Sequence, residues 1–322
     1  MIALVRFGAG LIVSALLVCG AAHSQTFPSK TIRFVVPFPS GSSTDSFARF
    51  LAQRLSKDIN QAVIVDNKAG GDGVIAAQEV IRSAPDGYTV MLGTNSTHAA
   101  NVSLFKQLSY DPVADFTPIA RLMRVPYVLV VRPDFPAKNV AEFIAVAKAR
   151  GGKFSFGSGN AGSRAGAELM KTITGFDAMN VAYRGIPPAI IDLLGGQIDF
   201  IVADMSTALG QFKSNALRGL AVTSGTRVAY LPDMPTLAEA GMPGYELVGW
   251  TAAFAPAHTP SDIVARLNRM FVSAIADGEA AAFLPTIGGE ASPSSPSELA
   301  EFMKSETAKW ARIVDAAQIE RQ

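Results

Sequence analysis

The first stretch suited to binding chemistry is a hydroxyl-rich turn between an apolar run and an amphipathic run. Residues 32–36 predict a buried strand, and Phe47, Leu51 and Leu55 recur at the spacing of one helix face. A helix that begins directly after a strand presents free N–H groups and partial positive charge, which suit an anion. The candidate binding residues of this turn are Phe38, Ser40, Gly41, Ser42, Ser43, Thr44 and Asp45.

Helix capping is the simpler role for these hydroxyls. Thr44 or Asp45 alone would satisfy the free N–H groups of a helix that begins at Asp45. Capping needs only one such residue, however, and four hydroxyls crowd the turn. We therefore expect the turn both to cap the helix and to bind a ligand, with Phe38 facing either the ligand or the core.

A second polar loop follows the strand predicted at residues 89–92. Thr94 and Asn95 offer a hydroxyl and an amide that can hydrogen-bond a carboxylate. An ordinary polar loop has the same composition. The glycine-rich turn at residues 70–73 contains Asp72, which would repel an anion, so we interpret that turn as structural.

A glycine pattern in the middle of the chain matches the dinucleotide-binding fingerprint G-x-G-x-x-G. Gly157, Gly159 and Gly162 lie between a predicted strand and a predicted helix. The fingerprint also requires an acidic residue at the end of the next strand, where this chain has Arg184, which would suit NADP instead. An NADP-binding oxidoreductase is therefore one alternative function.

The same loop can instead bind a carboxylate through its backbone. The N–H groups at the helix start would form a cradle, with Ser158 before it and Arg164 after it as a charged partner. We favour this interpretation because the pattern lies mid-chain in a protein that we expect to be secreted. The alternative interpretation of Arg164 is a surface side chain that faces solvent and does not contact the ligand. The cradle residues are Asn160, Ala161, Gly162 and Ser163.

Two further polar residues end strands in the same half of the chain. Tyr183 could hydrogen-bond or stack on a ligand, and a core tyrosine with a wet hydroxyl would have the same sequence context. Asp204 could accept a hydrogen bond from a ligand hydroxyl or amine, although capping the following helix is its simpler role.

Residues for catalysis and metal binding are sparse. The sequence has no G-x-S-x-G nucleophile elbow, and only His98 and His258 could serve as a base after the leader. A secreted hydrolase, the second alternative function, would have to depend on His98. Paired histidines or dense carboxylates at metal-ligand spacing do not occur. We predict no catalytic residue, no metal site and no cofactor.

The N-terminus has the pattern of a secretory signal peptide, residues 1–24. Arg6 precedes an apolar run at residues 7–19, and residues 22–24 resemble a cleavage site. The alternative is a lipoprotein anchor at Cys19. Val18 disfavours it, because lipoprotein signals have a small residue directly before the cysteine. Cleavage would remove the only cysteine and with it disulfide and thiolate chemistry.

The composition of the mature chain excludes some partners. Without Arg6, 27 of the 28 basic residues remain against 27 acidic residues, a balance that argues against nucleic acid. No later stretch is long and apolar enough to span a bilayer. We expect a soluble periplasmic monomer.

Short apolar runs alternate with amphipathic runs, which is typical of an α/β protein with parallel sheets covered by helices. The alternation restarts after residue 126, and two apolar extended runs, residues 127–131 and 246–254, bracket the second part. We expect the chain to cross twice between lobe 1, residues 25–126 with 251–322, and lobe 2, residues 127–250. A single doubly wound sheet with a C-terminal helical cap fits the pattern nearly as well.

An ordered set of short segments resembles the tripartite tricarboxylate transporter receptors, known as the Bug family, over essentially the whole mature chain. Single segments are unspecific, whereas their combination in this order is highly specific. The segments are Ile32-Arg33-Phe34-Val35-Val36-Pro37-Phe38-Pro39, Thr44-Asp45, Ala48-Arg49, Ala84-Pro85-Asp86-Gly87-Tyr88-Thr89, Tyr110-Asp111-Pro112, Asp115-Phe116, Tyr183-Arg184-Gly185, Asp192-Leu193-Leu194-Gly195-Gly196-Gln197, Leu220-Ala221-Val222-Thr223, Leu231-Pro232-Asp233-Met234-Pro235-Thr236 and Glu239-Ala240-Gly241.

The resemblance implies a type II periplasmic-binding-protein fold, with two doubly wound α/β lobes joined by two hinge crossings. It implies a non-catalytic receptor that captures a small carboxylate, for which we expect a di- or tricarboxylate. The partners that it implies are the integral membrane permease subunits of a tripartite secondary transporter. It also implies that residues 37–45 and 158–163 bind the ligand.

The sequence departs from the family pattern at four positions. Ser42 and Ser43 stand where the family commonly has glycine, and Ala182 replaces a usual proline. Arg164 stands where the family often has histidine, and an additional arginine beside the cradle would suit a second carboxylate. These departures leave the individual ligand undetermined. An aromatic diacid would stack on the rings of Phe38 and Tyr183.

Overall fold

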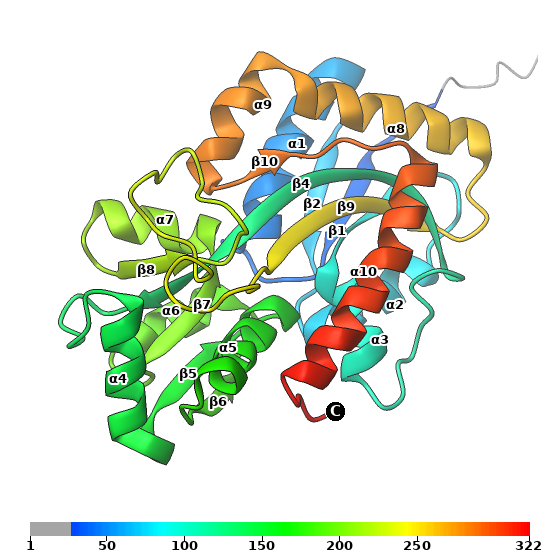
Figure 1. Cartoon of the computed structure of the whole chain (residues 1–322). Helices are drawn as coiled ribbons and strands as arrows, with labels where there is room; N and C mark the ends of the chain where they lie inside the picture. The colour runs from blue at the N-terminus through cyan, green and yellow to red at the C-terminus, as the bar shows by residue number, and fades with distance from the viewer. Residues whose placement is uncertain (1–26) are drawn as a thin grey trace, which may run out of the picture.

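Two long antiparallel strands, β4 (Phe116–Val131) and β9 (Val248–Pro256), connect two lobes in the computed structural model, which describes residues 27–322 (Figure 1). Strand β4 pairs with β9 over residues 116–126 and with β7 over residues 127–131, so one strand belongs to both sheets. The predicted signal peptide lies outside the described residues. We keep the names lobe 1 and lobe 2 for the elements on either side of this crossing.

Lobe 1 contains a parallel set of strands in the order β2-β1-β3, which β9 extends in the antiparallel direction. The short strand β10 pairs with the first part of β4. Its strands are β1 (Ile32–Val36), β2 (Val63–Asn67), β3 (Thr89–Thr94) and β10 (Glu290–Ala291). Its α-helices are α1 (Ser43–Ile59), α2 (Val74–Ile81), α3 (Asn101–Leu104), α8 (Ser261–Ala276), α9 (Gly278–Phe283) and α10 (Pro296–Ala316).

Lobe 2 contains a second sheet in which β5 pairs in parallel with both β6 and β7. The end of β4 closes this sheet through antiparallel pairs with β7 and β8. Its strands are β5 (Ser155–Ser158), β6 (Met179–Ala182), β7 (Phe200–Asp204) and β8 (Arg218–Val222). Its helices are α4 (Val140–Arg150), α5 (Ala161–Thr174), α6 (Ile186–Leu194) and α7 (Met205–Lys213).

The predicted α/β alternation with two crossings is therefore present, but the sheets are mixed rather than purely parallel. The reason is geometric. One crossing strand leaves lobe 1 and the other returns to it, so β4 and β9 must run in opposite directions when they pair. Separate parallel sets lie on the two sides of the crossing, and β9 and β4 link them into one continuous ten-stranded sheet within the described residues.

The helix stripes read from the sequence are buried as expected. Phe47, Leu51 and Leu55 of α1 are buried, as are Val264, Leu267, Phe271 and Ile275 of α8. Leu299, Met303 and Trp310 of α10 are also buried, and this helix packs on β4, α3 and α5. The closing helices therefore return to lobe 1, which brings the C-terminal segment back beside the cleft between the lobes.

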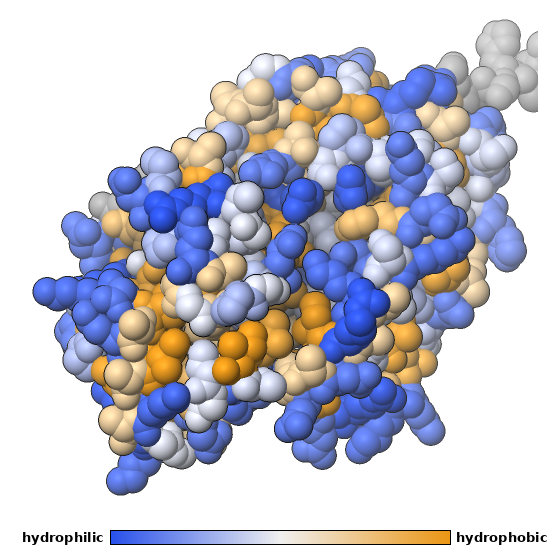
Figure 2. Space-filling model, viewed as in Figure 1, coloured by the Kyte–Doolittle hydropathy of each residue, from blue (hydrophilic) through white to orange (hydrophobic). Residues whose placement is uncertain are grey.

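Hydrophilic residues cover much of the face seen in Figure 2, and hydrophobic residues gather over lobe 2. Within residues 27–322 no single helix has the length and apolar character needed to cross a membrane. The bent pair formed by Ser261–Ala276 and Gly278–Ile287 reaches the required length and composition only when both helices are taken together.

Candidate functional site

A cavity lies where the two lobes meet on the crossing strands. Lobe 1 contributes the turn before α1, the first two residues of α1, and residues 94–96 at the end of β3. Lobe 2 contributes residues at the starts of α5, α6 and α7. The lining residues are Phe38, Ser42, Ser43, Thr44, Thr94, Asn95, Ser96, Val125, Tyr127, Asn160, Ile186, Asp204, Gly249, Trp250 and Thr251.

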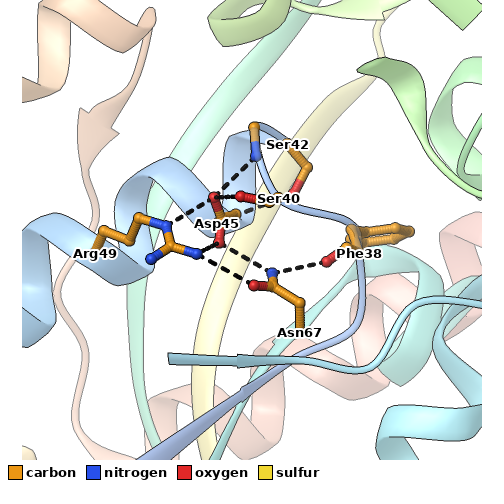
Figure 3. A network of polar contacts seen from close by, with 7 residues as sticks. Phe38, Ser40, Ser42, Asp45, Arg49 and Asn67 are labelled. Atoms are coloured by element: carbon orange, nitrogen blue, oxygen red, sulfur yellow. Dashed lines mark hydrogen bonds and ion pairs between the residues drawn. The ribbon is translucent and has the colours of Figure 1, made fainter. Parts of the chain in front are cut away.

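Asp45 holds the turn between β1 and α1 in shape from outside the cavity (Figure 3). Its Oδ2 accepts hydrogen bonds from the Gly41 N–H (2.9 Å) and from Arg49 Nε (3.0 Å). Its Oδ1 accepts from Asn67 Nδ2 (3.0 Å), which also donates to the Phe38 carbonyl (2.9 Å). Burial alone would raise the pKa of this carboxyl, but the bonds from Arg49, Gly41 and Asn67 hold it below its ordinary value.

Ser42, rather than Thr44 or Asp45, caps α1. Its Oγ accepts the Asp45 N–H at 3.3 Å, and the helix begins at Ser43, two residues earlier than the sequence predicted. The expected caps fail because the Asp45 carboxylate is already engaged by Gly41 and Arg49, and because Thr44 lies inside the first turn. As a result, the Ser43 and Thr44 amides are the first two of the helix and have no intrahelical acceptor.

Three buried polar atoms that line the cavity have no hydrogen-bond partner within the described residues: Ser43 Oγ, Thr94 Oγ1 and Asn95 Nδ2. A buried polar group without a partner costs roughly 1–3 kcal/mol. Native proteins rarely leave such groups unpaired, and three that border one space could all be paired by one polar ligand. The site at the end of β3 and at the start of α1 therefore has the donors that a carboxylate needs.

The loop at residues 157–163 does not offer the free amide cradle expected from the sequence. Ser163 Oγ accepts the Gly159 and Asn160 amides (2.9 and 3.1 Å), and Asn160 Oδ1 accepts the Ser163 amide (2.8 Å). The Ala161 amide donates to Ser96 Oγ across the cleft (3.2 Å). This capping box satisfies the helix start internally, so only the Asn160 side chain is left to face the cavity.

The three glycines of the G-x-G-x-x-G pattern are explained by protein packing. A Cβ at Gly157 would lie 2.6 Å from Ile198, and one at Gly159 would lie 2.1 Å from the Gly185 backbone. A Cβ at Gly162 would lie 1.9 Å from the Tyr127 hydroxyl. Close neighbours already occupy the space that a pyrophosphate would need, so the pattern gives no support to the nucleotide alternative.

Asp204 brings a carboxyl into the cavity from lobe 2. Its Oδ2 accepts a hydrogen bond from Asn160 Nδ2 (3.0 Å), and it lies opposite Tyr127 in the β4–β7 pair. Its side chain makes no capping bond to α7, contrary to the role that seemed simpler from the sequence. Burial raises the pKa of this carboxyl to about 7, and the bond from Asn160 opposes the rise only in part.

Comparison with known proteins identifies the family. Residues 47–319 match the family described as tripartite tricarboxylate transporter family receptor. The chain belongs to this receptor family. Its fold is the type II periplasmic-binding fold, and members of the family are periplasmic solute-binding receptors rather than enzymes. The family and the fold that the sequence segments indicated are thereby confirmed.

Several relatives match the receptor over nearly its whole length. The protein BugT of Bordetella pertussis is 33% identical, and the match covers 95% of this chain and 94% of BugT. A Rhodopseudomonas palustris protein solved with adipate, Rpa4515, is 34% identical, with a TM-score of 0.90 over 92% of this chain and all of that one. MatC of the same organism, solved with bound malate, is 32% identical, with a TM-score of 0.84 over 89% of this chain and all of that one.

The receptor brings eight of the predicted site residues to the cavity lining. They come from both lobes and from loops more than a hundred residues apart in sequence. They are Phe38, Ser42, Ser43, Thr44, Thr94, Asn95, Asn160 and Asp204.

The other predicted site residues lie behind or beside the lining. Ser40, Gly41 and Asp45 shape the first turn, and Ala161, Gly162 and Ser163 form the start of α5. Ser158 donates to Asn180 Oδ1 (2.7 Å), Tyr183 donates to Asp192 Oδ2 (2.7 Å), and Arg164 donates to the Glu320 carbonyl (3.1 Å).

His98, on which a hydrolase would have depended, lies in the core of lobe 1. Its ring stacks on Phe254 (3.7 Å between centroids), and its Nδ1 lies 2.8 Å from Thr97 Oγ1. Burial lowers its pKa to about 3, so it stays neutral. It does not line the cavity. The described residues also hold no group of three or more His, Cys, Asp or Glu that could bind a metal ion.

Sequence reasoning missed the lining residues on the crossing strands, chiefly Tyr127, Gly249 and Trp250. A signal for them was present, because residues 127–131 and 246–254 were already interpreted as the crossings. Side chains at a crossing point face the space between the lobes, so the crossings also had to form the floor of the cleft. Ser96, Val125, Ile186 and Thr251 complete the missed set.

Replacing Gly162 with alanine should force the Tyr127 hydroxyl out of position. We expect the free energy of unfolding to fall by about 1–3 kcal/mol, as for other overpacked core sites, with weaker ligand binding because Tyr127 lines the cavity. Urea denaturation checks the stability. Gly210→Ala in α7 is the matched control, because nothing lies within 4 Å of its added Cβ. Equal stability of the two variants would contradict this packing role.

Asp204 should make the stability of the protein depend on pH. Its folded-state pKa of about 7 exceeds the ordinary 3.8, so the folded protein holds this proton more tightly than the unfolded chain. The carboxyl therefore lowers the free energy of unfolding progressively as the pH rises from about 4 to about 7. Asp204→Asn should remove this loss, and urea denaturation should show a larger gain over wild type at about pH 8 than at about pH 5.

The control for that measurement is Asp134→Asn, which alters a carboxyl with 76% of its side chain exposed. It should change the free energy of unfolding equally at both pH values. A gain from Asp204→Asn that is the same at both pH values would mean that the Asp204 carboxyl is not desolvated in the folded protein.

Proposed function

We propose that this receptor captures a small dicarboxylate in the periplasm and presents it to the membrane permease subunits of a tripartite transporter. The observation that carries the proposal is the set of unpaired buried atoms at Ser43, Thr94 and Asn95, which border one cavity between the lobes. The N-terminal signal-peptide pattern supports export. Relatives that were solved with adipate and with malate support a carboxylate ligand.

The cavity binds the anion with neutral donors. No described Lys, Arg or His side chain lines it. The donors available to a carboxylate are the hydroxyls of Ser43 and Thr94, the Asn95 amide and the first two amides of α1, whose partial positive charge adds to the attraction. A hydrogen bond to a charged group contributes about 1.5–3 kcal/mol. Three or four such bonds approach the roughly 8 kcal/mol of a micromolar complex.

The apolar lining fits the carbon chain of such a ligand. Phe38, Val125, Ile186 and Trp250 line the cavity together with the polar residues of both lobes. A short aliphatic or aromatic diacid would place its hydrocarbon part against these side chains and its polar ends against the donors. Because the apolar groups come from both lobes and from both crossing strands, ligand burial requires the lobes to be close together.

Closure of the lobes follows from where the contacts lie. Ser43, Thr94 and Asn95 belong to lobe 1, and Asn160 and Asp204 belong to lobe 2, so a ligand contacts the full set only in the closed form. The Ala161–Ser96 hydrogen bond joins the lobes at the edge of the cavity. Strands β4 and β9 are continuous through the crossing and provide the hinge. The extra contacts of the closed form drive closure.

A panel of ligands tests this function directly. Adipate, malate, citrate, phthalate and NADP are added to the mature protein, and the unfolding temperature is followed. We expect one of the di- or tricarboxylates to raise it by several degrees, because a ligand that binds only the folded state stabilises it. The same acid should lower the radius of gyration in small-angle X-ray scattering.

The control ligand for adipate is 1,6-hexanediol, which has the same carbon chain and no carboxylate, and it should not stabilise the protein. Stabilisation by NADP alone would contradict the receptor function. A tightly bound acid that leaves the radius of gyration unchanged would contradict closure while leaving carboxylate binding intact.

Removing the unpaired hydroxyl of Ser43 should separate binding from folding. Ser43→Ala deletes a buried Oγ that has no protein partner, so the free protein should unfold at the same temperature or slightly higher. Its affinity for the acid found in the panel should fall about tenfold, which corresponds to the loss of roughly 1.4 kcal/mol. Isothermal titration calorimetry measures the affinity.

Ser46→Ala is the matched control, since Ser46 lies on the same helix but does not line the cavity. Its affinity should equal that of the wild type. Unchanged affinity of Ser43→Ala would remove Ser43 from the binding site.

A further inference from the structure

The cavity contains one ionisable carboxyl and no described basic side chain, which is unexpected in a site for an anion. Asp204 enters from lobe 2, whereas the unpaired donors Ser43, Thr94 and Asn95 enter from lobe 1. A dicarboxylate that spans both lobes therefore meets donors at one end and a carboxyl at the other. If both carboxyls at that second end were ionised, they would repel each other in a desolvated space.

We propose that Asp204 binds the second end of a dicarboxylic acid through one shared proton. This proton lies between the Asp204 carboxyl and the ligand carboxyl at that end. This inference rests on the proposed function, because it assigns the second end of the same ligand. The proton comes from solvent, or is already present on Asp204 before the ligand binds. No covalent bond forms or breaks other than the O–H bond that is shared.

The geometry around Asp204 leaves one oxygen available for this contact. Its Oδ2 accepts the bond from Asn160 Nδ2 at 3.0 Å. Its Oδ1 receives no hydrogen bond from another described residue, although the residue is only 7% exposed and lines the cavity; the backbone N–H of Asp204 itself also interacts with the carboxyl. A protonated Oδ1 would donate to a ligand carboxylate, and an ionised Oδ1 would accept from a protonated one. Either arrangement gives a short charge-assisted hydrogen bond.

The surroundings of Asp204 supply no positive charge that would keep two carboxylates ionised. Tyr127 of β4 lies opposite it, and Asn160 before α5 donates to it. Trp250 of β9 also lines the cavity and donates from Nε1 to Glu306 Oε2 of α10 at 2.9 Å, and Lys309 lies 3.9 Å from the other oxygen of Glu306. Burial already raises the pKa of Asp204 to about 7, in agreement with this arrangement.

A ligand amine or hydroxyl is the alternative partner of Asp204. An ammonium group brings three donors, and Asp204 is the single carboxyl among the lining residues. An ammonium would also require Asp204 to be ionised, which its burial disfavours. These observations favour a carboxyl group at this end, and the two partners predict opposite dependence of the affinity on pH.

Calorimetry of adipate binding at pH 6 and pH 8 tests the proposal on the mature wild-type protein. If Asp204 titrates near pH 7 and must share a proton with the ligand, the dissociation constant should be about tenfold larger at pH 8 than at pH 6. Titrations at pH 8 in phosphate and in Tris, which differ in ionisation enthalpy, should show uptake of about one proton. Should adipate bind too weakly to measure, malate and then phthalate are used in its place.

Asp204→Asn should abolish this dependence, because an asparagine amide can donate to a ligand carboxylate without a proton from solvent. Its dissociation constant should differ less than about twofold between the two pH values. Asp134→Asn, which changes an exposed carboxyl, should keep the full tenfold dependence. Circular dichroism at both pH values checks that the Asp204 variant is folded.

The outcomes separate this inference from the proposed function. The shared proton is overturned if the wild type binds with equal affinity at both pH values. It is also overturned if the tenfold dependence on pH persists in Asp204→Asn. In both cases carboxylate binding stands. Binding of malate or aspartate that tightens as the pH rises would assign Asp204 to a hydroxyl or amine donor and likewise overturn it. If no acid binds the wild type at either pH, the proposed function itself fails.

Discussion

The structure depends on the cost of burying polar groups that the protein itself does not pair. Ser43, Thr94 and Asn95 each keep a polar atom out of solvent and without a partner, and all three border one cavity. Each such atom costs roughly 1–3 kcal/mol. Under the proposed function a ligand would remove this cost by completing the hydrogen bonds. The free energy of binding would then come in part from hydrogen bonds that the protein leaves unmade.

Strands β4 and β9 make this arrangement possible because they belong to both lobes. Tyr127, Gly249 and Trp250 lie near the point where the pairing of β4 changes from β9 to β7, so the crossing strands form the floor of the cavity. Under the proposed closure, the donors of lobe 1 would move toward Asn160 and Asp204 while this floor moves little. Packing reinforces this geometry, since Gly162 leaves the space that the Tyr127 hydroxyl occupies.

The sequence predicts the helices and strands well, because the spacing of apolar residues follows directly from which face of each element is buried. The stripes of α1 and α8 are buried as expected, and the two long apolar runs became the crossing strands. The turn before α1 and the end of β3, which the sequence singles out as candidate loops, both line the cavity. These features follow from local composition, so one sequence is enough to find them.

Individual roles within the loops could not be predicted, because they depend on partners that are distant in sequence. Asn67 and Arg49 engage Asp45, which leaves Ser42 to cap the helix. Ser96 takes the Ala161 amide from the other lobe, which removes part of the expected cradle. Arg164 lies beside the C-terminal segment, whose return to the cleft is not visible in the residues around it.

Asp45 and Asp204 show how far the surroundings decide the chemistry of one residue type. Both are buried aspartates close to the start of a helix. Asp45 receives hydrogen bonds from Arg49, Gly41 and Asn67, and its pKa is lowered, so it serves as a fixed anion that holds the turn. Asp204 receives one hydrogen bond from another residue, and burial raises its pKa to about 7.

The two carboxyls divide the work of the site between them. The ionised Asp45 stays behind the lining, where its charge is compensated by Arg49 and does not oppose an incoming anion. Asp204 lines the cavity, where a permanent charge would repel the proposed anion, and its burial instead favours a carboxyl that can carry a proton. A cavity without a basic side chain could therefore hold an anion. Its one acidic group, Asp204, can make its hydrogen bonds in the protonated form and need not be charged.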